Sequence, residues 1–471
     1  MARDQSYDGQ FALVLHTHMP YVEGFDTWPF GEEWLWEAVA TSYLPVLDVL
    51  EQTGAPVTVS LTPVLCDQLA APDAIERCLD FIRDIRPAAH AIDRAELAAE
   101  LHAPLDHSAA VYARAADELA ARPDVLARFA PFASWTSSAT HAVLPLLATD
   151  AGARLQIQTG VDGHRSRFGD WRGGFWLPEC AHSSWLEPLL AEEGARATCV
   201  DLSDVLGLGS LANLQPLRGA GDLTLVPLDR QTTDLVWSQD GYPADGGYRD
   251  YHHRTRIDHR VWAVDGTPYD PDRGAALARE HAADFVARVL VRLREAREQP
   301  GALVVCAIDT ELLGHWWHEG PQWLRAVIDE CERQGLELVH LDDALERREA
   351  DGVPAPAAAE LALPVTSWGT PRDLTTWSGP AVAGFAWRAR AAELALLAAG
   401  RGVTPRAARE LLALQSSDWA FMVDRELAAP YGHARAEGHH KALLAELATP
   451  GSLPAELRSL APRLSVAPLL G

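Results

Sequence analysis

Two carboxylates stand where an apolar strand is expected to end and a loop to begin. Glu179 lies within Gly174-Phe-Trp-Leu-Pro-Glu-Cys-Ala-His182, and Asp309 follows the apolar run Leu303-Val-Val-Cys-Ala-Ile308. Barrel enzymes keep their catalytic groups at the C-terminal ends of buried strands. Because Trp and His residues flank both carboxylates, the pattern predicts an acid pair acting on a sugar, with Glu179 as nucleophile and Asp309 as acid/base.

Each carboxylate also has an alternative explanation. Burying Glu179 is costly unless it is paired, and a structural ion pair with an arginine would account for it. Glu311, two residues after Asp309, would lie on the same side if the strand continued, so it competes for the acid/base role. The sequence alone leaves both alternatives open.

Aromatic and imidazole side chains gather just after Asp309, in the cluster His315-Trp-Trp-His318. Aromatic faces stack on the C–H faces of pyranose rings, while polar edges bond the hydroxyls. We therefore expect His315 and Trp316 to bind substrate.

His16 and His18 end the first apolar run and, by strand alternation, point to one face. Three interpretations compete for this pair. The imidazoles could be satisfied by neighbours in the core, could ligate a metal as in amidohydrolase barrels, or could bind sugar hydroxyls. We favour sugar binding, because the carboxylates and tryptophans point the same way. A metal site would need further ligands, for which Asp309 is a candidate.

Composition narrows the class of partner. The chain has 471 residues, of which 48% are hydrophobic and 23% charged, and its formal net charge is −26. Such a charge would repel nucleic acid or an anionic membrane, whereas a neutral glucan is unaffected by it. The six cysteines are scattered without a close pair, no signal-like segment opens the chain, and no run approaches a membrane span. We expect a cytoplasmic protein.

Strand-like and helical runs alternate to about residue 345, which favours an α/β architecture. The clearest expected strands are residues 11–15, 57–61, 198–200, 303–308 and 336–340. Helices are expected at 276–297, 381–399, 406–423 and 432–447, and a long loop at 240–256. A boundary at 351–356 divides a catalytic part (1–350, with an inserted loop region at about 182–260) from a helical part (351–471).

The ordered motifs resemble the signature regions of glycoside hydrolase family 57. They are His16-Thr-His-Met-Pro20, Leu61-Thr-Pro-Val-Leu65, Gly174 to His182, Asp309 to Gly320, and a helical region, Leu411 to Phe421. The resemblance implies an incomplete TIM-like (β/α)7 barrel whose active-site cleft is completed by a helical C-terminal domain. It also implies a retaining mechanism on α-1,4-glucans without a cofactor or metal.

The same resemblance implies roles for individual residues. Glu179 would be the nucleophile and Asp309 the acid/base. His16 and His18 would bind the sugar at the reacting subsite, and the C-terminal helices would bring in Asp418 and Trp419.

Within the family, the chain looks most similar to the 1,4-α-glucan branching enzymes, which cleave α-1,4 and form α-1,6 linkages. By that likeness Trp28, Trp237, Trp368 and Trp377 would line the donor and acceptor grooves, although core packing would explain any single one. The segment 203–222 departs from the group, because it is short and lacks the Tyr that favours transfer. A hydrolase or a 4-α-glucanotransferase is therefore the alternative. The expected partner is an α-1,4-glucan, and the expected state a monomer or small homo-oligomer.

Overall fold

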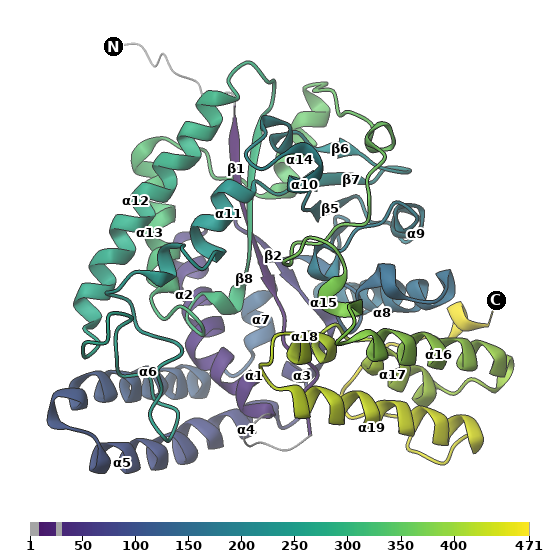
Figure 1. The fold of residues 1–471 in the computed structure, drawn as a ribbon, viewed down its shortest axis with the longest axis horizontal. Coiled ribbons are helices and arrows are strands. Elements are labelled where there is room, and N and C mark those ends of the chain that lie inside the picture. Colours follow the sequence, from purple (N-terminus) through teal and green to yellow (C-terminus); the bar gives the residue numbers. More distant parts are fainter. Residues whose placement is uncertain (1–8, 25–30, 471) are drawn as a thin grey trace.

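The computed structural model describes residues 9–24 and 31–470, and within them the strands form one curled sheet (Figure 1). The sheet has eight strands in the order β6-β7-β5-β4-β3-β2-β1-β8. Their bounds are β1 Gln10–Thr17, β2 Thr58–Leu61, β3 Ala133–Ser137, β4 Gly174–Trp176, β5 Ala197–Val200, β6 Leu217–Arg218, β7 Thr224–Pro227 and β8 Leu303–Asp309.

β1 is the central strand that the apolar run at 11–15 predicts, and its residues from Phe11 to Leu15 are fully buried. β1 pairs in parallel with both β2 and β8, which explains why all three read as continuous apolar runs. In this register His16 lies beside Asp309 on one side and Ser60 on the other. The carboxyl ends of the three strands therefore bring their polar residues to one edge.

The sheet closes almost into a barrel. Seven neighbouring strands of the described chain run parallel, and only the short β6 pairs antiparallel, with β7. Just after β7, the backbone N–H of Asp229 donates to the carbonyl oxygen of Val305 in β8 at 2.9 Å. One hydrogen bond thus joins the first and last parallel strands, and the predicted incomplete (β/α)7 barrel is confirmed.

Helices cover the outside of the barrel, with α12 and α13 packed on each other along the flank near β8 (Figure 1). Among the described helices, none is both long and apolar enough to cross a membrane. The helices before residue 351 are α1 Glu32–Ala38, α2 Leu44–Thr53, α3 Pro63–Leu69, α4 Ala74–Asp80, α5 Arg86–Glu96, α6 His102–Ala121, α7 Val125–Phe129, α8 Asp150–Phe168, α9 Leu186–Glu192, α10 Ser203–Leu206, α11 Arg230–Trp237, α12 Pro271–Glu295, α13 Gly320–Gln334 and α14 Leu341–Ala350.

The C-terminal part is helical, and its helices lie at one side of the barrel, where they build an apolar core that also includes Tyr21, Val64, Ala139 and Leu155 (Figure 1). They are α15 Thr375–Ser378, α16 Ala383–Ala399, α17 Pro405–Leu414, α18 Asp418–Asp424 and α19 Ala429–Ala448. The prediction of a single helix over 406–423 is wrong, because residues 415–417 interrupt the helix between α17 and α18. There the backbone N–H of Ser417 bonds the carbonyl of His141 at 3.1 Å, so the helix gives way to a contact with the barrel.

Two further expectations need correction. The strand predicted at 336–340 is reduced to one parallel bridge between Phe11 and Leu338. The other residues of β1 pair with β2 and β8, and helix α14 starts directly after His340. The inserted loop region at about 182–260 is too broad, because it contains β5, β6 and β7 with α9 to α11. Only about 238–270 lacks regular structure, apart from a short 3-10 turn at Tyr242–Ala244.

The close approach of α8 to β3 gives a test of this packing. A Cβ on Gly160 would lie 2.1 Å from the carbonyl oxygen of Ser137, a backbone atom that cannot move aside. Gly160→Ala should therefore lower the free energy of unfolding by about 1–3 kcal/mol. At Gly163, one turn along the same helix, the nearest atom is the flexible end of Arg167 at 3.2 Å. Gly163→Ala should be neutral or stabilise by about 0.5–1 kcal/mol.

Chemical denaturation of the two variants beside the parent chain measures both effects. Equal stability of the two variants would contradict the close packing of α8 on β3.

Candidate active site

Glu179 sits in a strained turn at the end of β4. The turn Pro178–Cys180 places Glu179 in the left-handed region, with φ 60° and ψ 21°, where a residue with a side chain is costly. Its carboxylate accepts hydrogen bonds from Nε1 of Trp368 at 3.1 Å and from Oγ of Ser417 at 3.2 Å. Two segments remote in sequence thus hold this side chain.

No arginine of the described chain forms an ion pair with Glu179, which contradicts the structural ion-pair explanation. The basic side chain beside Glu179 is the His141 imidazole, whose Nδ1 lies 3.7 Å from Oε1 of Glu179. Burial, reinforced by the negative charge of Asp418, raises the pKa of Glu179 to about 7 despite the two hydrogen bonds. A carboxyl group with such a pKa and no arginine partner is typical of a reacting group.

Asp309 and Glu311 are clearly distinguished by their partners. Glu311 is fixed, because Oε1 accepts from the hydroxyl of Tyr43 at 2.7 Å and from the backbone N–H of His18 at 3.1 Å. Asp309, the last residue of β8, forms no side-chain hydrogen bond with any residue that the structure describes. Its carboxyl group is therefore the one that remains available to a substrate.

The surroundings of Asp309 favour its protonated form. Burial first, and then the charges of Glu311 and Glu179, hold the pKa of Asp309 well above its usual range. A carboxyl group kept neutral near an ionisable one is how paired acids divide the roles of proton donor and nucleophile.

Three histidines line the site between the carboxylates. Nε2 of His16 lies 3.0 Å from Nε2 of His141, and the rings of His18 and His141 stack with centroids 3.9 Å apart. Burial lowers the pKa of His16 and His141 well below its usual value. For His18, burial opposes protonation but the carboxylate of Asp418 outweighs it, so the pKa is raised.

His141 was missed by the sequence reasoning. It follows β3, whose residues 133–137 mix Ala, Ser and Thr with one Trp and give no strong strand pattern. His141 has φ 57°, in the same left-handed region as Glu179. Its position after a parallel strand was the only available signal, and it depended on recognising that strand first.

His18, His141 and Asp418 could in principle hold a metal ion, since their ligand atoms lie within 4.8 Å of one another. Their present bonds argue for another role. Nδ1 and Nε2 of His18 pair with Thr62 and Asp418, and the ring nitrogens of His141 pair with Ser417 and His16. All four nitrogens are satisfied, and stacked rings do not aim their lone pairs at one point. The geometry fits hydrogen bonding better than the metal alternative.

The break between α17 and α18 brings the C-terminal part to the site. Asp418 accepts from Nε2 of His18 at 3.0 Å and from the hydroxyl of Ser416. Trp419, which the resemblance placed at the substrate, does not reach the cleft. Its indole is fully buried, donates to the carbonyl of Ala413 at 2.7 Å and packs within the C-terminal core. Its predicted role in substrate binding is therefore wrong.

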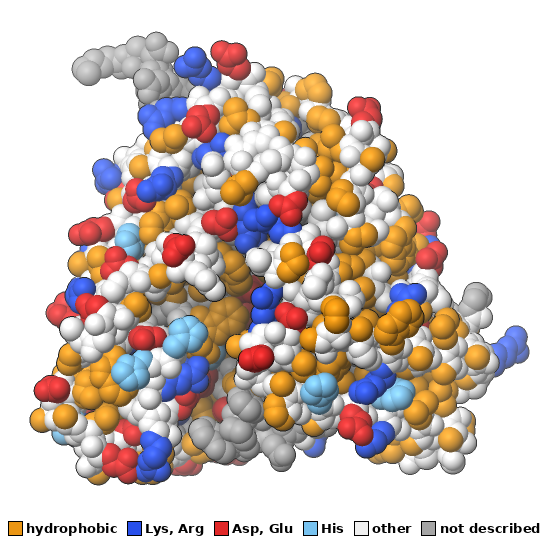
Figure 2. Space-filling model, in the orientation of Figure 1, with side chains coloured by type: hydrophobic (Ala, Val, Ile, Leu, Met, Phe, Trp, Pro, Cys, Tyr) orange, Lys and Arg blue, Asp and Glu red, His pale blue; other side chains and the backbone are white. Residues whose placement is uncertain are grey.

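Four tryptophans form a track that leads away from Glu179. The ring of Trp176 stacks on His16 at 4.6 Å and meets the edge of Trp368 at 5.0 Å. Trp237 stacks on Trp368 at 5.7 Å, and Trp316 lies 6.3 Å from Trp237 with 40% of its surface exposed. Figure 2 shows this face of the molecule hollowed near its centre, with hydrophobic side chains deep inside and charged side chains and histidines around it.

The remaining predicted binding residues lie elsewhere. Trp377 is only 2% exposed and packs on Gly369 and Val382, so it supports the segment that carries Trp368 and offers no open face. His315 turns away from the track into a neighbouring pocket beside Glu37. Trp28 lies outside the described residues.

Models of known protein families match two parts of this chain. The family model for glycosyl hydrolase family 57 covers residues 135–357, and that for the C-terminal region of 1,4-alpha-glucan branching enzymes covers residues 391–463. A probable 1,4-alpha-glucan branching enzyme of Mycobacterium tuberculosis is 32% identical over 97% of this chain and 94% of its own length.

Two archaeal proteins are similar as well. The 1,4-alpha-glucan branching enzyme of Thermococcus kodakarensis is 31% identical over 92% of this chain and 72% of its own length. The crystal structure of a branching enzyme from Pyrococcus horikoshii superposes with a TM-score of 0.89, 28% identity, and coverage of 98% of this chain and 97% of that one. Family match, relatives and superposition agree, so the chain belongs to glycosyl hydrolase family 57, beside its branching enzymes.

Proposed function

We propose that this chain is a 1,4-α-glucan branching enzyme, which cleaves α-1,4 linkages and forms α-1,6 linkages through a glycosyl-enzyme. The observation that carries the proposal is Glu179, a buried carboxylate that has no arginine partner and accepts hydrogen bonds from Trp368 and Ser417. Its negative charge contributes to the raised pKa of Asp309. Similarity to branching enzymes along nearly the whole chain supports the same conclusion.

In the mechanism that we propose, Asp309 exchanges one proton with the substrate, while Glu179 forms and then loses a covalent bond to it. Asp309 donates its proton to the glycosidic oxygen while the carboxylate of Glu179 attacks the anomeric carbon, so the C–O bond breaks and the leaving chain departs neutral. Asp309, now ionised, takes the proton from the 6-hydroxyl of an acceptor glucose, whose oxygen displaces Glu179. The donor segment ends on an α-1,6 linkage with both carboxyl groups restored.

Neutral imidazoles suit the sugar contacts of this mechanism. His16 and His141, with their lowered pKa, stay uncharged, and a sugar hydroxyl that binds either ring replaces one of its present hydrogen-bond partners. His18, paired with Asp418, supplies a positive charge that favours the ionised form of Glu179. We assign His16, His18 and Asp418 to binding of the reacting sugar.

Transfer to a glucan rather than to water requires an acceptor held in place. The track of Trp368, Trp237 and Trp316 supplies apolar faces for such a chain, and we assign these residues to it. Free thiols fit a reducing compartment, so we also propose a cytoplasmic enzyme of glycogen-type polymers. We propose further that it acts as a monomer or small homo-oligomer.

Hydrolysis or 4-α-glucanotransfer is the second candidate, and one observation favours it. The segment 203–222 is tied to the chain that follows the barrel: Asp204 accepts from Arg372 at 2.6 Å, and the backbone N–H of Arg218 donates to the carbonyl of Pro356 at 2.8 Å. It contains no Tyr and is tied at both ends. In that position it excludes less water from the cleft than a projecting loop would.

Incubation with amylose separates these activities. We expect new α-1,6 signals in the proton NMR spectrum with few new reducing ends, because the tryptophan track holds the acceptor. Reducing ends without α-1,6 signals would establish a hydrolase, and altered chain lengths with neither would establish a 4-α-glucanotransferase.

Substitution of the two carboxylates tests their roles. Glu179→Gln should abolish turnover of amylose, because the amide is no nucleophile, while the Oε1 atom still accepts a hydrogen bond from Ser417. Asp309→Asn should lower turnover by about 10²–10⁴-fold, with partial recovery on glycosides whose leaving group needs no proton. The control is Glu349→Gln, which makes the same change at an exposed position.

Thermal unfolding establishes that each variant is folded. Turnover by a folded Glu179→Gln enzyme would refute the nucleophile assignment.

The pH dependence follows from the same groups. Glu179 must be ionised, so kcat/KM should fall as the pH drops through about 7. Asp309 must be protonated, so kcat/KM should fall again at high pH. Burial and the charge of Glu311 raise the pKa of Asp309, hence Glu311→Gln should move the alkaline limb to lower pH. The glutamine oxygen can still accept from Tyr43 and His18.

The pH profile of the parent chain is the control for this shift. An alkaline limb unchanged or moved upward in Glu311→Gln would contradict the role given to Asp309.

A further inference from the structure

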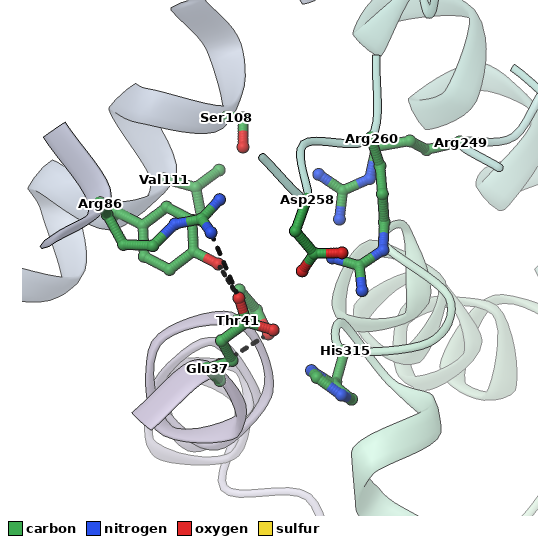
Figure 3. Close-up of a pocket in the computed structure, with 10 residues that line it drawn as sticks. Glu37, Thr41, Arg86, Ser108, Val111, Arg249, Asp258, Arg260 and His315 are labelled. Carbon is green, nitrogen blue, oxygen red and sulfur yellow. Dashed lines mark hydrogen bonds and ion pairs between the residues drawn. The ribbon is translucent and has the colours of Figure 1, made fainter. Parts of the chain in front are cut away.

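A second cavity lies beside the active-site cleft and has no role in the proposed reaction. It is a small pocket, partly open to solvent, between α1, α5 and α6 on one side and the segment 249–260 on the other (Figure 3). Arg86 points into it from one side and Arg249 and Arg260 from the other. The other lining residues are Glu37, Thr41, Ser108, Val111, Tyr112, Asp258 and His315.

The charges lining this cavity leave an excess of positive charge in a protein whose net charge is −26. Three guanidinium groups face two carboxylates, Glu37 and Asp258. Asp258 is also paired with Arg254 at 2.9 Å, outside the cavity lining. Burial lowers the pKa of His315 to about 4, so its imidazole is neutral and adds a hydrogen-bonding group without charge.

Several donors in the cavity lack a protein acceptor. The Arg249 guanidinium forms no hydrogen bond or ion pair with any residue that the structure describes. Arg86 is only 7% exposed, and its Nε has no partner there, although Nη1 lies 3.5 Å from Glu37. A buried guanidinium donor without an acceptor, such as Nε of Arg86, is costly, while Arg249 is partly exposed. Guanidinium groups are also the groups that bind carboxylate or phosphate oxygens in pairs.

The walls of the cavity are rigid. The Arg86 guanidinium lies over the ring of Tyr112 at 4.6 Å, and that of Arg260 over the ring of Tyr251 at 4.5 Å. Nε of Arg260 also bonds the carbonyl of Tyr251 at 3.2 Å. Side chains fixed in this way lose little conformational entropy when a ligand binds.

The cavity continues the tryptophan track. His315 is the neighbour of Trp316, with ring centroids 6.2 Å apart, and the ring of Tyr251 lies 6.0 Å from His315. Aromatic side chains therefore lead without a gap from Glu179 to the arginines. A chain lying along the track would bring its end, or a substituent on it, to this cavity.

We propose that Arg86, Arg249 and Arg260 form a binding site for an oxyanion, a carboxylate or phosphate group. The group is carried either by a small free anion or by the glucan itself, and the second source rests on the proposed function. In both cases the oxygens accept hydrogen bonds from the unpartnered guanidinium donors, and the bound charge offsets the positive excess.

Isothermal titration calorimetry of the full chain tests the site with inorganic phosphate. It also compares maltoheptaose with maltoheptaonate, the same oligosaccharide oxidised to a carboxylate at its reducing end. We expect saturable binding of an anionic probe that is weakened at least tenfold by Arg249→Gln, the substitution that breaks no existing bond. The matched control is Arg279→Gln, an exposed arginine of α12, which should bind as the parent does.

The outcomes separate the two sources. Phosphate binding that Arg249→Gln weakens, with equal affinity for the two oligosaccharides, establishes a site for a free anion. Tighter binding of maltoheptaonate than of maltoheptaose, lost in Arg249→Gln, establishes a group carried on the glucan. No saturable binding of either anionic probe, or binding unchanged in both Arg249→Gln and Arg86→Gln, overturns the proposal. Calorimetry needs no turnover, so failure of the branching assay would leave this result interpretable.

Discussion

The structure depends on holding one buried carboxylate without an arginine beside it. Glu179 obtains its two hydrogen bonds from residues 189 and 238 positions later in the chain, Trp368 and Ser417. An arginine would hold the carboxylate more tightly, but it would also lower its pKa. Neutral donors hold Glu179 instead, and the barrel and the C-terminal helices must meet at this point to supply them.

The electrostatics around Glu179 and Asp309 follow from the burial of their carboxyl groups with few counter-ions nearby. Glu179, Asp309 and Glu311 all have raised pKa values, since burial penalises the charged form and each carboxylate opposes its neighbours. His18 is the one site histidine whose pKa is raised, because Asp418 pairs with it. The cleft therefore carries little net charge, which suits a neutral polymer, while the surplus of positive charge lies in the adjoining arginine cavity.

The sequence was most informative where strands are buried on both faces. β1 and β8 read as apolar runs that end in functional residues, and the positions of His16 and Asp309 followed from parallel pairing. β3 was missed because its five residues are mostly small and polar, and His141 was missed with it. Trp419 and Trp377 were misassigned because a tryptophan in sequence does not show whether its ring faces a cleft or a core.

The distance along the chain between Glu179 and Ser417 has a consequence for synthesis. During translation Glu179 is made long before its hydrogen-bond donor Ser417, which lies 238 positions later. A nascent or truncated chain that ends before Ser417 also lacks Asp418, so it contains both carboxyl groups without these partners. The surroundings of Glu179 are therefore completed only when nearly all of the polypeptide exists.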